Sequence, residues 1–345
     1  MKLSDLSNPK AASAAIEALK KRFKERCCMA PDKNSCKGKI VSAHTLSEAA
    51  VLRRISRGGF VYSPRTNLYP SELHECVSFD LLGVGETSVF YGFCEHHDKS
   101  LFSSIEDHPF ICSHQQNFLH AYRAVAKESY LKRRQAETSP TVEMVRQIHG
   151  FKEDQWIDDS MLLYQQFASL LGADEMDQCK DKFDKILLKE DWSRLVTWVI
   201  EFEKKPSVVC SAPYSPDFDF EGEPLQDFGN VDITLKTMIV NVFPTDTGGF
   251  ALFSYLDTDS AVCENLVASL LRQPHLTSAL IWFIFGYFEN IAISPDWFES
   301  TALEFRKQLK AHFIYSLDPT NFSGSRLDLC PEYIDDWQPK HVFRI

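Results

Sequence analysis

The feature that most constrains the fold is a pair of potential metal ligands, Cys94 and His97, directly after an apolar, β-prone run. A second pair, Cys28 and Cys36, lies in the loop "CCMAPDKNSCKG" near the N-terminus. Zinc is held by a tetrahedron of thiolate and imidazole ligands, usually supplied as two short-spaced pairs. The sequence therefore predicts a structural zinc site of Cys28, Cys36, Cys94 and His97, with Cys27 as an alternative to Cys28. The other interpretation is four unrelated buried or surface residues.

The composition is that of a globular chain, and the absence of a signal-peptide segment at the N-terminus leads us to expect it in a reducing compartment. Of its 345 residues, 44% are hydrophobic and 25% charged, and only 14 are Gly and 16 Pro, which excludes a low-complexity chain. Ten cysteines in such a compartment indicate buried thiols or metal ligands rather than disulfides. The polar N-terminus lacks a signal-peptide segment, and the longest apolar run, Leu276 to Phe288, is shorter than the about 20 residues that span a bilayer. We therefore expect a cytoplasmic protein without membrane contact, in which this run forms a buried helix.

The hydrophobic pattern predicts an α+β fold in three parts. We expect a zinc-stapled module over residues 1–112, a helical segment over 113–205 and an α+β domain over 206–345. Within the helical segment, helices are expected from residue 113 to 137 and over "SPTVEMVRQIHG", "DSMLLYQQFASLLG" and "DWSRLVTWVIEFEKK". In the last part, "PSVVCSAPYS", "VDITLKTMIVNVF" and "GFALFSYL" are expected to be strands.

The N-terminal module is expected to combine short strands and helices around the zinc. Asn8, which precedes a proline, predicts the start of a helix that ends near Arg26. The runs "KIVSAH" and "TSVFYGF" are β-prone, and the second leads directly into the Cys-x2-His pair. Between them, Thr45 and Glu48 have the spacing of a helix capping box.

The charge is distributed unevenly along the chain. The net charge is −11, yet residues 1–66 hold 14 Lys and Arg against 5 Asp and Glu. This asymmetry places any contact with a polyanion at the N-terminal end, although a solvated helix surface would have the same composition. The candidate nucleic-acid-binding side chains form two patches. The first patch consists of Lys20, Lys21, Arg22, Lys24 and Arg26, and the second consists of Arg53, Arg54 and Arg57.

The order of these residues resembles that of the HNH, or ββα-metal, nucleases in their zinc-stapled, treble-clef form. In that family, a histidine at the end of the first strand is the general base, and the residue after the second ligand pair binds the hydrolytic metal. The resemblance covers residues 28–106 and implies that His44 is the base and that Asp98 binds Mg²⁺ or Mn²⁺. A neutral imidazole can deprotonate water near pH 7, and a hard carboxylate suits a hard cation.

The chain also departs from that pattern. The family has Asp or Glu just before the base histidine, where this chain has Ala43, and Asn67 is the only candidate for the motif's middle position. Two other interpretations of His44 are a zinc ligand and a hydrogen-bonded core residue. Asp98 also suits the first turn of a helix by its charge alone. His96 is expected to face solvent.

Two stretches are similar to those of a group of uncharacterised bacterial proteins. They are "C…C-x-G-K-I-x-x-A-H-T" and "G-F-C-x-x-H-D-x-x-L-F", and we associate that group with mobile or defence-related genes. The expected function is metal-dependent nucleic-acid cleavage, a hydrolase activity, in antiviral defence. The alternative is a non-catalytic, zinc-stabilised protein that binds nucleic acid or a protein partner. Ala43 favours the alternative, whereas the ordered ligand string and the basic N-terminus favour the nuclease.

Overall fold

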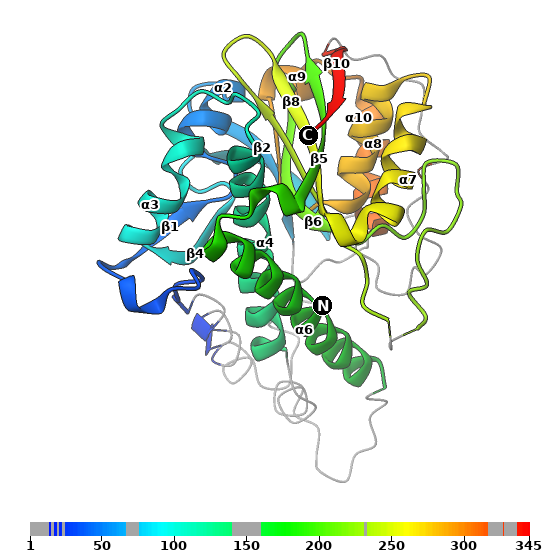
Figure 1. Ribbon diagram of the computed structural model, residues 1–345. Helices are drawn as coiled ribbons and strands as arrows, with labels where there is room; N and C mark the ends of the chain where they lie inside the picture. The colour runs from blue at the N-terminus through cyan, green and yellow to red at the C-terminus, as the bar shows by residue number, and fades with distance from the viewer. Residues whose placement is uncertain are drawn as a thin grey trace.

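The computed structural model describes residues 14, 17–18, 21–22, 25–66, 76–139, 160–230, 233–316, 327 and 337–345. Helices and strands are mixed along the chain, which confirms the predicted α+β class (Figure 1). Lys20, Lys24, Asn67, the segment "SPTVEMVRQIHG" and most of the helix expected to begin at Asn8 lie outside the described residues.

An eight-stranded antiparallel sheet forms the centre of the molecule. Its strands, in spatial order, are β10 (Pro339–Arg344), β5 (Leu195–Phe202), β8 (Gly249–Leu256), β7 (Met238–Pro244), β6 (Val208–Tyr214), β9 (Ile291–Ile293), β2 (Phe60–Thr66) and β3 (Val77–Gly83). Strands β2 and β3 belong to the predicted N-terminal module, β5 belongs to the predicted helical segment, and the other five strands belong to the predicted C-terminal domain. One sheet therefore joins all three parts, and the predicted boundaries at 112 and 205 do not separate it.

Both faces of the sheet are covered. Every residue of β7 is buried, and successive residues of this strand belong to different cores, with Ile239 in one and Val240 in another. Helices α7 (Ser260–Leu271), α8 (Leu276–Tyr287) and α10 (Leu303–Ser316) pack on the face of Val240. Helix α4 (His114–Thr138) packs on the opposite face, between the sheet and α6 (Ser160–Lys189) (Figure 1). Burial on both sides explains why the central strands are continuous apolar runs in the sequence.

The predicted helices at residues 113–137 and 276–288 are confirmed. Ser113 is the N-cap of α4, where its Oγ accepts a hydrogen bond from the Gln116 backbone N–H at 3.2 Å. Helix α8 contains the longest apolar run, and ten of its twelve residues are buried. The shorter helical elements are η2 (Lys33–Ser35), η3 (Glu48–Leu52), α2 (Arg53–Ile55), η5 (Trp192–Arg194), η6 (Asp257–Asp259) and α9 (Pro295–Ser300).

A small ββα module lies beside the large sheet. Strand β1 (Ile40–His44) pairs antiparallel with β4 (Val89–Cys94), and α3 (Glu95–Glu106) follows β4 directly. In the register, Ile40 lies opposite Cys94 and His44 opposite Val89. The Phe93 and Phe102 side chains are fully buried with ring centroids 5.1 Å apart, so they fix α3 on the two strands. Truncating either to Ala would cost about 3–5 kcal/mol.

Two local predictions were wrong. The segment "DWSRLVTWVIEFEKK" forms η5 and then β5, not a helix. Its burial alternates from Leu195 to Val199, and its β-branched residues suit the central place that β5 has between β10 and β8. Thr45 is not the helix cap either, because the Ser47 Oγ accepts the hydrogen bond from the Ala50 backbone N–H at 3.2 Å.

Candidate metal centre and the adjoining charged group

The structure brings the four predicted zinc ligands together at the base of α3. One ligand atom from each of Cys28, Cys36, Cys94 and His97 lies within 4.8 Å of all the others. The His97 Nδ1 atom lies 3.4 Å from the Sγ of Cys28, 3.6 Å from that of Cys36 and 3.3 Å from that of Cys94. Zn–S bonds of about 2.3 Å and Zn–N bonds of about 2.0 Å at tetrahedral angles place S and N about 3.5 Å apart. The cluster is therefore compatible with a structural metal such as zinc.

The directions of their side chains distinguish Cys28 from Cys27 as the fourth cluster residue. The Cys28 thiol enters the cluster. The Cys27 thiol instead points to the Met29 sulfur, 3.8 Å away. His44, the other residue considered as a possible zinc ligand, is not part of the cluster.

Backbone geometry brings the two ligand pairs to one point. Gly38, two residues after Cys36, has φ +77, and a Cβ at this position would collide with the Glu95 side chain. This close approach lets the Glu95 N–H donate to the Lys39 carbonyl oxygen at 2.9 Å. Cys94 is the N-cap of α3, so the helix start carries the second pair.

A hydroxyl group orients the His97 ring. The Nε2 atom lies 2.8 Å from the Ser35 Oγ, and that hydroxyl donates to the Asp32 carbonyl oxygen at 3.2 Å. Because the Ser35 proton is committed to Asp32, Nε2–H donates to Ser35 and the Nδ1 lone pair faces the three sulfurs. Burial lowers the pKa of His97, which favours the neutral form that a metal requires.

The three thiols cannot easily ionise together without a cation. Burial and the neighbouring Cys28 raise the pKa of Cys36 to about 11. Burial also acts to raise the pKa of Cys94, but hydrogen bonds from the backbone N–H groups of His97 and Lys37 outweigh it and lower that pKa. A dication among these sulfurs would stabilise all three thiolates.

His44 lies at the end of β1 and is oriented by the loop before β4. Its Nδ1 atom lies 3.0 Å from the Thr87 carbonyl oxygen, so Nδ1 carries the proton and Nε2 has the free lone pair. Nε2 lies 3.8 Å from the Glu48 carboxylate, and the His44 side chain is 14% exposed. Burial lowers the pKa of His44, and the Thr87 and Glu48 contacts only partly offset this effect.

Asp98, the predicted hydrolytic-metal ligand, lies in the first turn of α3. Its Oδ1 atom is buried and has no hydrogen-bond partner among the described residues. Burial raises the pKa of Asp98, while Arg123 and His44 act to lower it. His96 is exposed, as expected.

Two residues that the sequence did not single out, Glu106 and Arg123, complete this charged group. The Arg123 side chain is 2% exposed, donates to the Glu106 carboxylate at 2.7 Å and lies over the Phe102 ring at 4.0 Å. Arg123 lowers the pKa of both His44 and Asp98, and Glu106 raises both. The four ionisable side chains therefore influence one another at a single site. Only the helix registry of α3 and α4 brings Glu106 and Arg123 there, so no sequence motif marks them.

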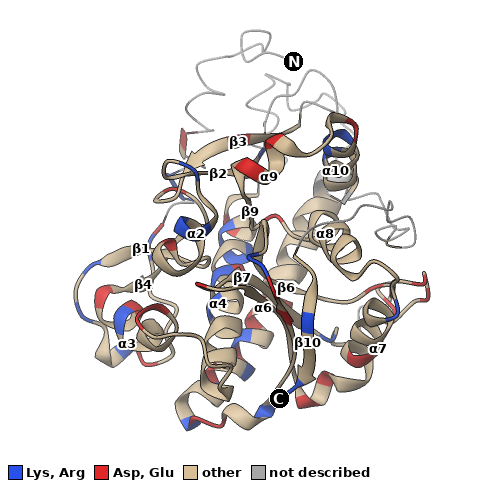
Figure 2. Ribbon diagram, turned by 90° about the horizontal axis from the view of Figure 1, so that it is seen from above, with Lys and Arg blue, Asp and Glu red and all other residues tan. Residues whose placement is uncertain are grey.

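The two predicted basic patches differ in their surroundings. Lys21 and Arg22 are exposed, and the Arg26 guanidinium lies 4.5 Å from the centroid of the Tyr91 ring. Every arginine of the second patch forms an ion pair. Arg53 pairs with Glu48, Arg54 pairs with Asp246, and Arg57 pairs with both Asp296 and Glu299. Figure 2 shows basic and acidic segments interleaved around α2 and α3. The described part of this surface is therefore less basic than the sequence count indicates.

Comparisons with known proteins found no matching family model, no matching curated protein and no matching solved structure. Within the part of the chain that the structure describes, no helix combines the length and the apolar character needed to cross a membrane.

Proposed function

We propose that the ββα module cleaves nucleic acid by metal-dependent hydrolysis, with zinc as its structural staple. The observation that carries the proposal is the state of His44. The Thr87 carbonyl oxygen accepts the Nδ1 proton, and burial keeps the ring neutral, so Nε2 is a free base near pH 7. Such an arrangement is what a general base for water activation requires.

Asp98 is the residue proposed to hold the hydrolytic cation. Its buried Oδ1 atom has no hydrogen-bond partner among the described residues, and a carboxylate oxygen is the ligand that Mg²⁺ or Mn²⁺ prefers. The cation would polarise the phosphate and stabilise the charge that develops on it. His44 Nε2 would accept the proton of the attacking water, whose oxygen forms the new bond to phosphorus as the ester oxygen leaves.

A non-catalytic, zinc-stabilised binding protein is the second candidate. The observation that favours it is the covering of the site. The His44 side chain is only 14% exposed, and Ala43, at the family's carboxylate position, is 1% exposed. Catalysis by this module therefore requires substrate or metal binding to open the site.

The two candidates differ in the effect of His44→Ala. Plasmid DNA, single-stranded DNA and RNA are incubated with the full chain and either Mg²⁺ or Mn²⁺. If the module is a nuclease, His44→Ala lowers the cleavage rate about 10²- to 10⁴-fold, the contribution of a general base, and leaves the zinc content unchanged. His114→Ala is the matched control, because His114 is exposed at the start of α4. Absence of cleavage by the wild-type chain under every metal condition, or full activity in His44→Ala, refutes the nuclease.

A further inference from the structure

Ser88, the residue just before β4, has a backbone conformation that few residues with a side chain adopt. Its φ is +61, in the left-handed region. Such a conformation is uncommon outside glycine and persists only where surrounding contacts hold the backbone in place. Ser88 follows Thr87, whose carbonyl oxygen accepts the hydrogen bond from His44 Nδ1–H. The contacts that hold Ser88 therefore bear on the proposed base.

Ser88 also holds the chain that follows His44. Its carbonyl oxygen accepts from the Thr45 N–H at 3.1 Å, and its hydroxyl oxygen accepts from the Leu46 N–H at 3.1 Å. Thr87 and Ser88 together thus contact the His44 ring and the two residues after it. A shift of this dipeptide would change the distance from the His44 Nδ1 to the Thr87 carbonyl oxygen.

Asn290, which directly precedes β9, anchors the Ser88 hydroxyl on the large sheet. The hydroxyl lies 2.8 Å from the Asn290 Oδ1, and the Asn290 Nδ2 donates to the Ser211 carbonyl oxygen of β6 at 2.7 Å. Because a carbonyl oxygen only accepts, the amide nitrogen must face Ser211 and the amide oxygen must face Ser88. The single proton of the Ser88 hydroxyl is therefore committed to Asn290.

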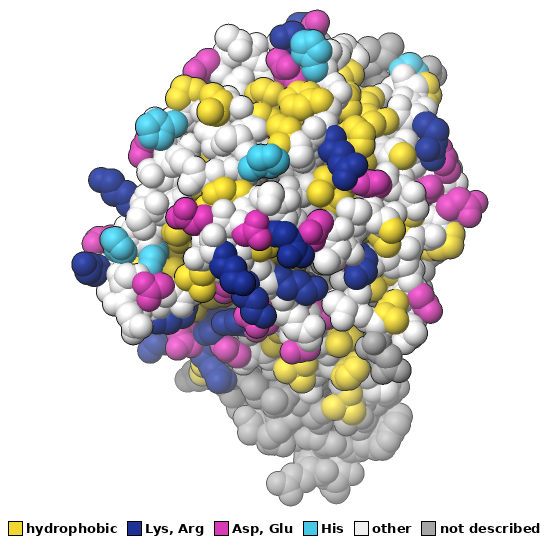
Figure 3. All heavy atoms as spheres, in the orientation of Figure 1, with side chains coloured by type: hydrophobic (Ala, Val, Ile, Leu, Met, Phe, Trp, Pro, Cys, Tyr) yellow, Lys and Arg dark blue, Asp and Glu magenta, His cyan; other side chains and the backbone are white. Residues whose placement is uncertain are grey.

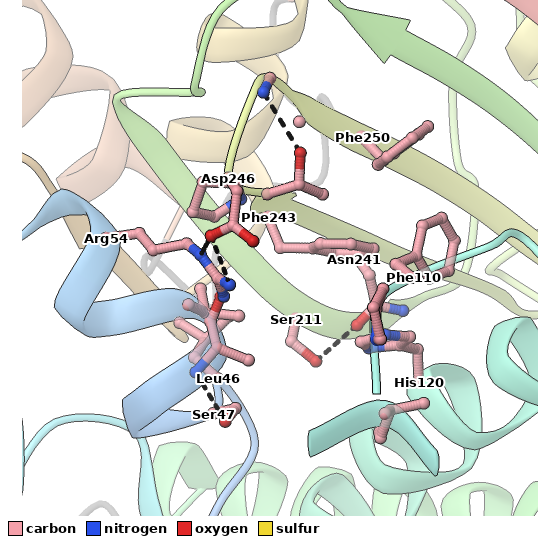
Figure 4. A pocket seen from close by; sticks show the side chains of 18 of the residues that line it. Leu46, Ser47, Arg54, Phe110, His120, Ser211, Asn241, Phe243, Asp246 and Phe250 are labelled. Carbon is pink, nitrogen blue, oxygen red and sulfur yellow. Dashed lines mark hydrogen bonds and ion pairs between the residues drawn. The ribbon is translucent and has the colours of Figure 1, made fainter. Parts of the chain in front are cut away.

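Ser211 gives this anchor a fixed place. It is 3% exposed in β6, and its hydroxyl donates to the Asn241 Oδ1 of the neighbouring strand β7 at 2.7 Å. Figure 4 shows this hydrogen bond at the wall of a cavity. A continuous series of hydrogen bonds thus leads from the buried sheet through Asn290 and Ser88 to the segment that holds His44.

The turn before β4 is closed by other hydrogen bonds. The Thr87 hydroxyl donates to the Gly83 carbonyl oxygen at 3.0 Å, and the Glu86 N–H donates to the same oxygen at 2.9 Å. The turn can therefore form without Asn290, and the contact between Ser88 and Asn290 sets its place against the sheet.

We propose that Ser88 and Asn290 are positioning residues for His44, because they hold the Thr87 carbonyl oxygen against its Nδ1–H. The inference deepens the proposed cleavage and rests on it for any effect on rate, whereas the effect on the ring does not depend on cleavage. While Nδ1–H is bound to Thr87, Nε2 keeps its lone pair for the proton of the attacking water. A ring released from Thr87 can carry its proton on Nε2 instead, and that form cannot accept a second proton there.

Nitrogen NMR of the full chain with isotope-labelled histidine tests the proposal. At about pH 8, where an imidazole with an ordinary or lowered pKa is neutral, the two ring nitrogens of His44 report which one carries the proton. His44→Gln identifies these signals among those of the 11 histidines. We expect the wild type to hold the proton on Nδ1 and Asn290→Ala to shift it partly to Nε2. Asn290→Ala should also lower kcat for cleavage about 3- to 10-fold, the factor that one hydrogen bond corresponds to.

Ser88→Gly makes the test specific, because glycine adopts the same φ without strain while the hydroxyl is removed. It should shift the His44 proton as Asn290→Ala does and leave the zinc content unchanged. If Asn290→Ala does not fold, Ser88→Gly alone decides. Ser193→Gly is the matched control, because the Ser193 hydroxyl contacts Asp191 at an exposed position, and this variant should behave as the wild type does.

The outcomes separate the positioning role from the proposed cleavage. A shifted proton with slower cleavage supports both. A shifted proton in a chain without nuclease activity supports the positioning role and refutes the nuclease. The positioning role is overturned if wild-type His44 carries its proton on Nε2, or if the proton stays on Nδ1 in either folded variant, whatever the cleavage rate.

Discussion

The Nδ1 atom of His44 lies 3.0 Å from the Thr87 carbonyl oxygen, which leaves Nε2 as the atom able to accept a proton. Burial lowers the pKa of His44 below its ordinary value of 6.5. A base whose pKa is lowered stays deprotonated as the pH falls, so the cleavage rate should be flat from about pH 8 to 6.5 and decrease only below that. The measurement is kcat/KM against pH at constant metal concentration. A decrease that begins above pH 7 would contradict a neutral, buried His44.

Zinc should be bound at about one ion per chain through the three cysteines and His97. Cys94→Ser removes a buried ligand at the start of α3 and should lose the metal and lower the melting temperature of the whole protein. Cys27→Ser is the matched control, because the Cys27 thiol faces Met29 outside the cluster. Metal analysis and thermal unfolding check both. Full zinc content in Cys94→Ser, or loss of zinc in Cys27→Ser, would be inconsistent with the site.

Ser35 should tune the zinc site without binding the ion. Ser35→Ala removes the acceptor of the His97 Nε2–H, so the ring loses the contact that holds its Nδ1 toward the sulfurs. Loss of such a partner typically lowers metal affinity about 10- to 100-fold. Competition with a chelator of known affinity measures the change. An unchanged affinity would mean that packing alone orients His97.

Binding of nucleic acid, if it follows the charge asymmetry, should belong to the N-terminal end and weaken steeply with salt. Figure 3 shows Lys and Arg side chains grouped on one face with Asp and Glu among them. Cations without a carboxylate partner should therefore contribute most to phosphate binding. Exchanging the exposed Lys21 and Arg22 together for Ala should reduce the salt slope by up to about 2 on duplex DNA. Arg57→Ala should have a smaller effect, since Arg57 pairs with Asp296 and Glu299. Equal effects of both changes would argue against this surface.

His312 should make the fold sensitive to acid. Its ring stacks on Trp282 at 3.8 Å, and burial lowers its pKa to about 4. Because the folded pKa lies below the unfolded value of 6.5, the unfolded chain takes up the proton first. The stabilisation is present above pH 6.5 and is lost as the pH falls toward 4, by roughly 3 kcal/mol.

The variant His312→Gln isolates this effect. An amide can still donate to the Trp282 carbonyl oxygen, which His312 Nε2 contacts at 3.1 Å, but it does not titrate. The melting temperature of His312→Gln should therefore fall less than that of the wild type between pH 6.5 and 4. His114→Gln, at an exposed position, should follow the wild type. Parallel curves for wild type and His312→Gln would show that His312 does not contribute.

The sequence predicted the parts of the site that depend on short spacing. Cys94 and His97 are three residues apart on one helix start, so their chemistry is visible in the sequence. Glu106 and Arg123 meet because α3 packs on α4, and no spacing rule carries that information.

Fold prediction met a similar limit. The apolar run of α8 has the length of a buried helix and was predicted correctly. For the run from Leu195 to Phe202 the sequence analysis predicts a helix, whereas the structure has strand β5. Its position between β8 and β10 decides the structure, and the partners in β8 alone lie far along the chain, from Phe202 with Gly249 to Leu195 with Leu256. Local propensity cannot register such partners.

The chain leaves the ββα module after β1 and returns to it only at β4, and the excursion between them supplies β2 and β3 at one end of the large sheet. The module is therefore tied to the sheet by two covalent crossings rather than by one linker. It cannot swing away as a hinged domain would, and strain at either place is transmitted to the other. We therefore expect that a change in metal occupancy at the Cys28, Cys36, Cys94 and His97 cluster is detectable by hydrogen exchange in β2, an element that contributes no ligand.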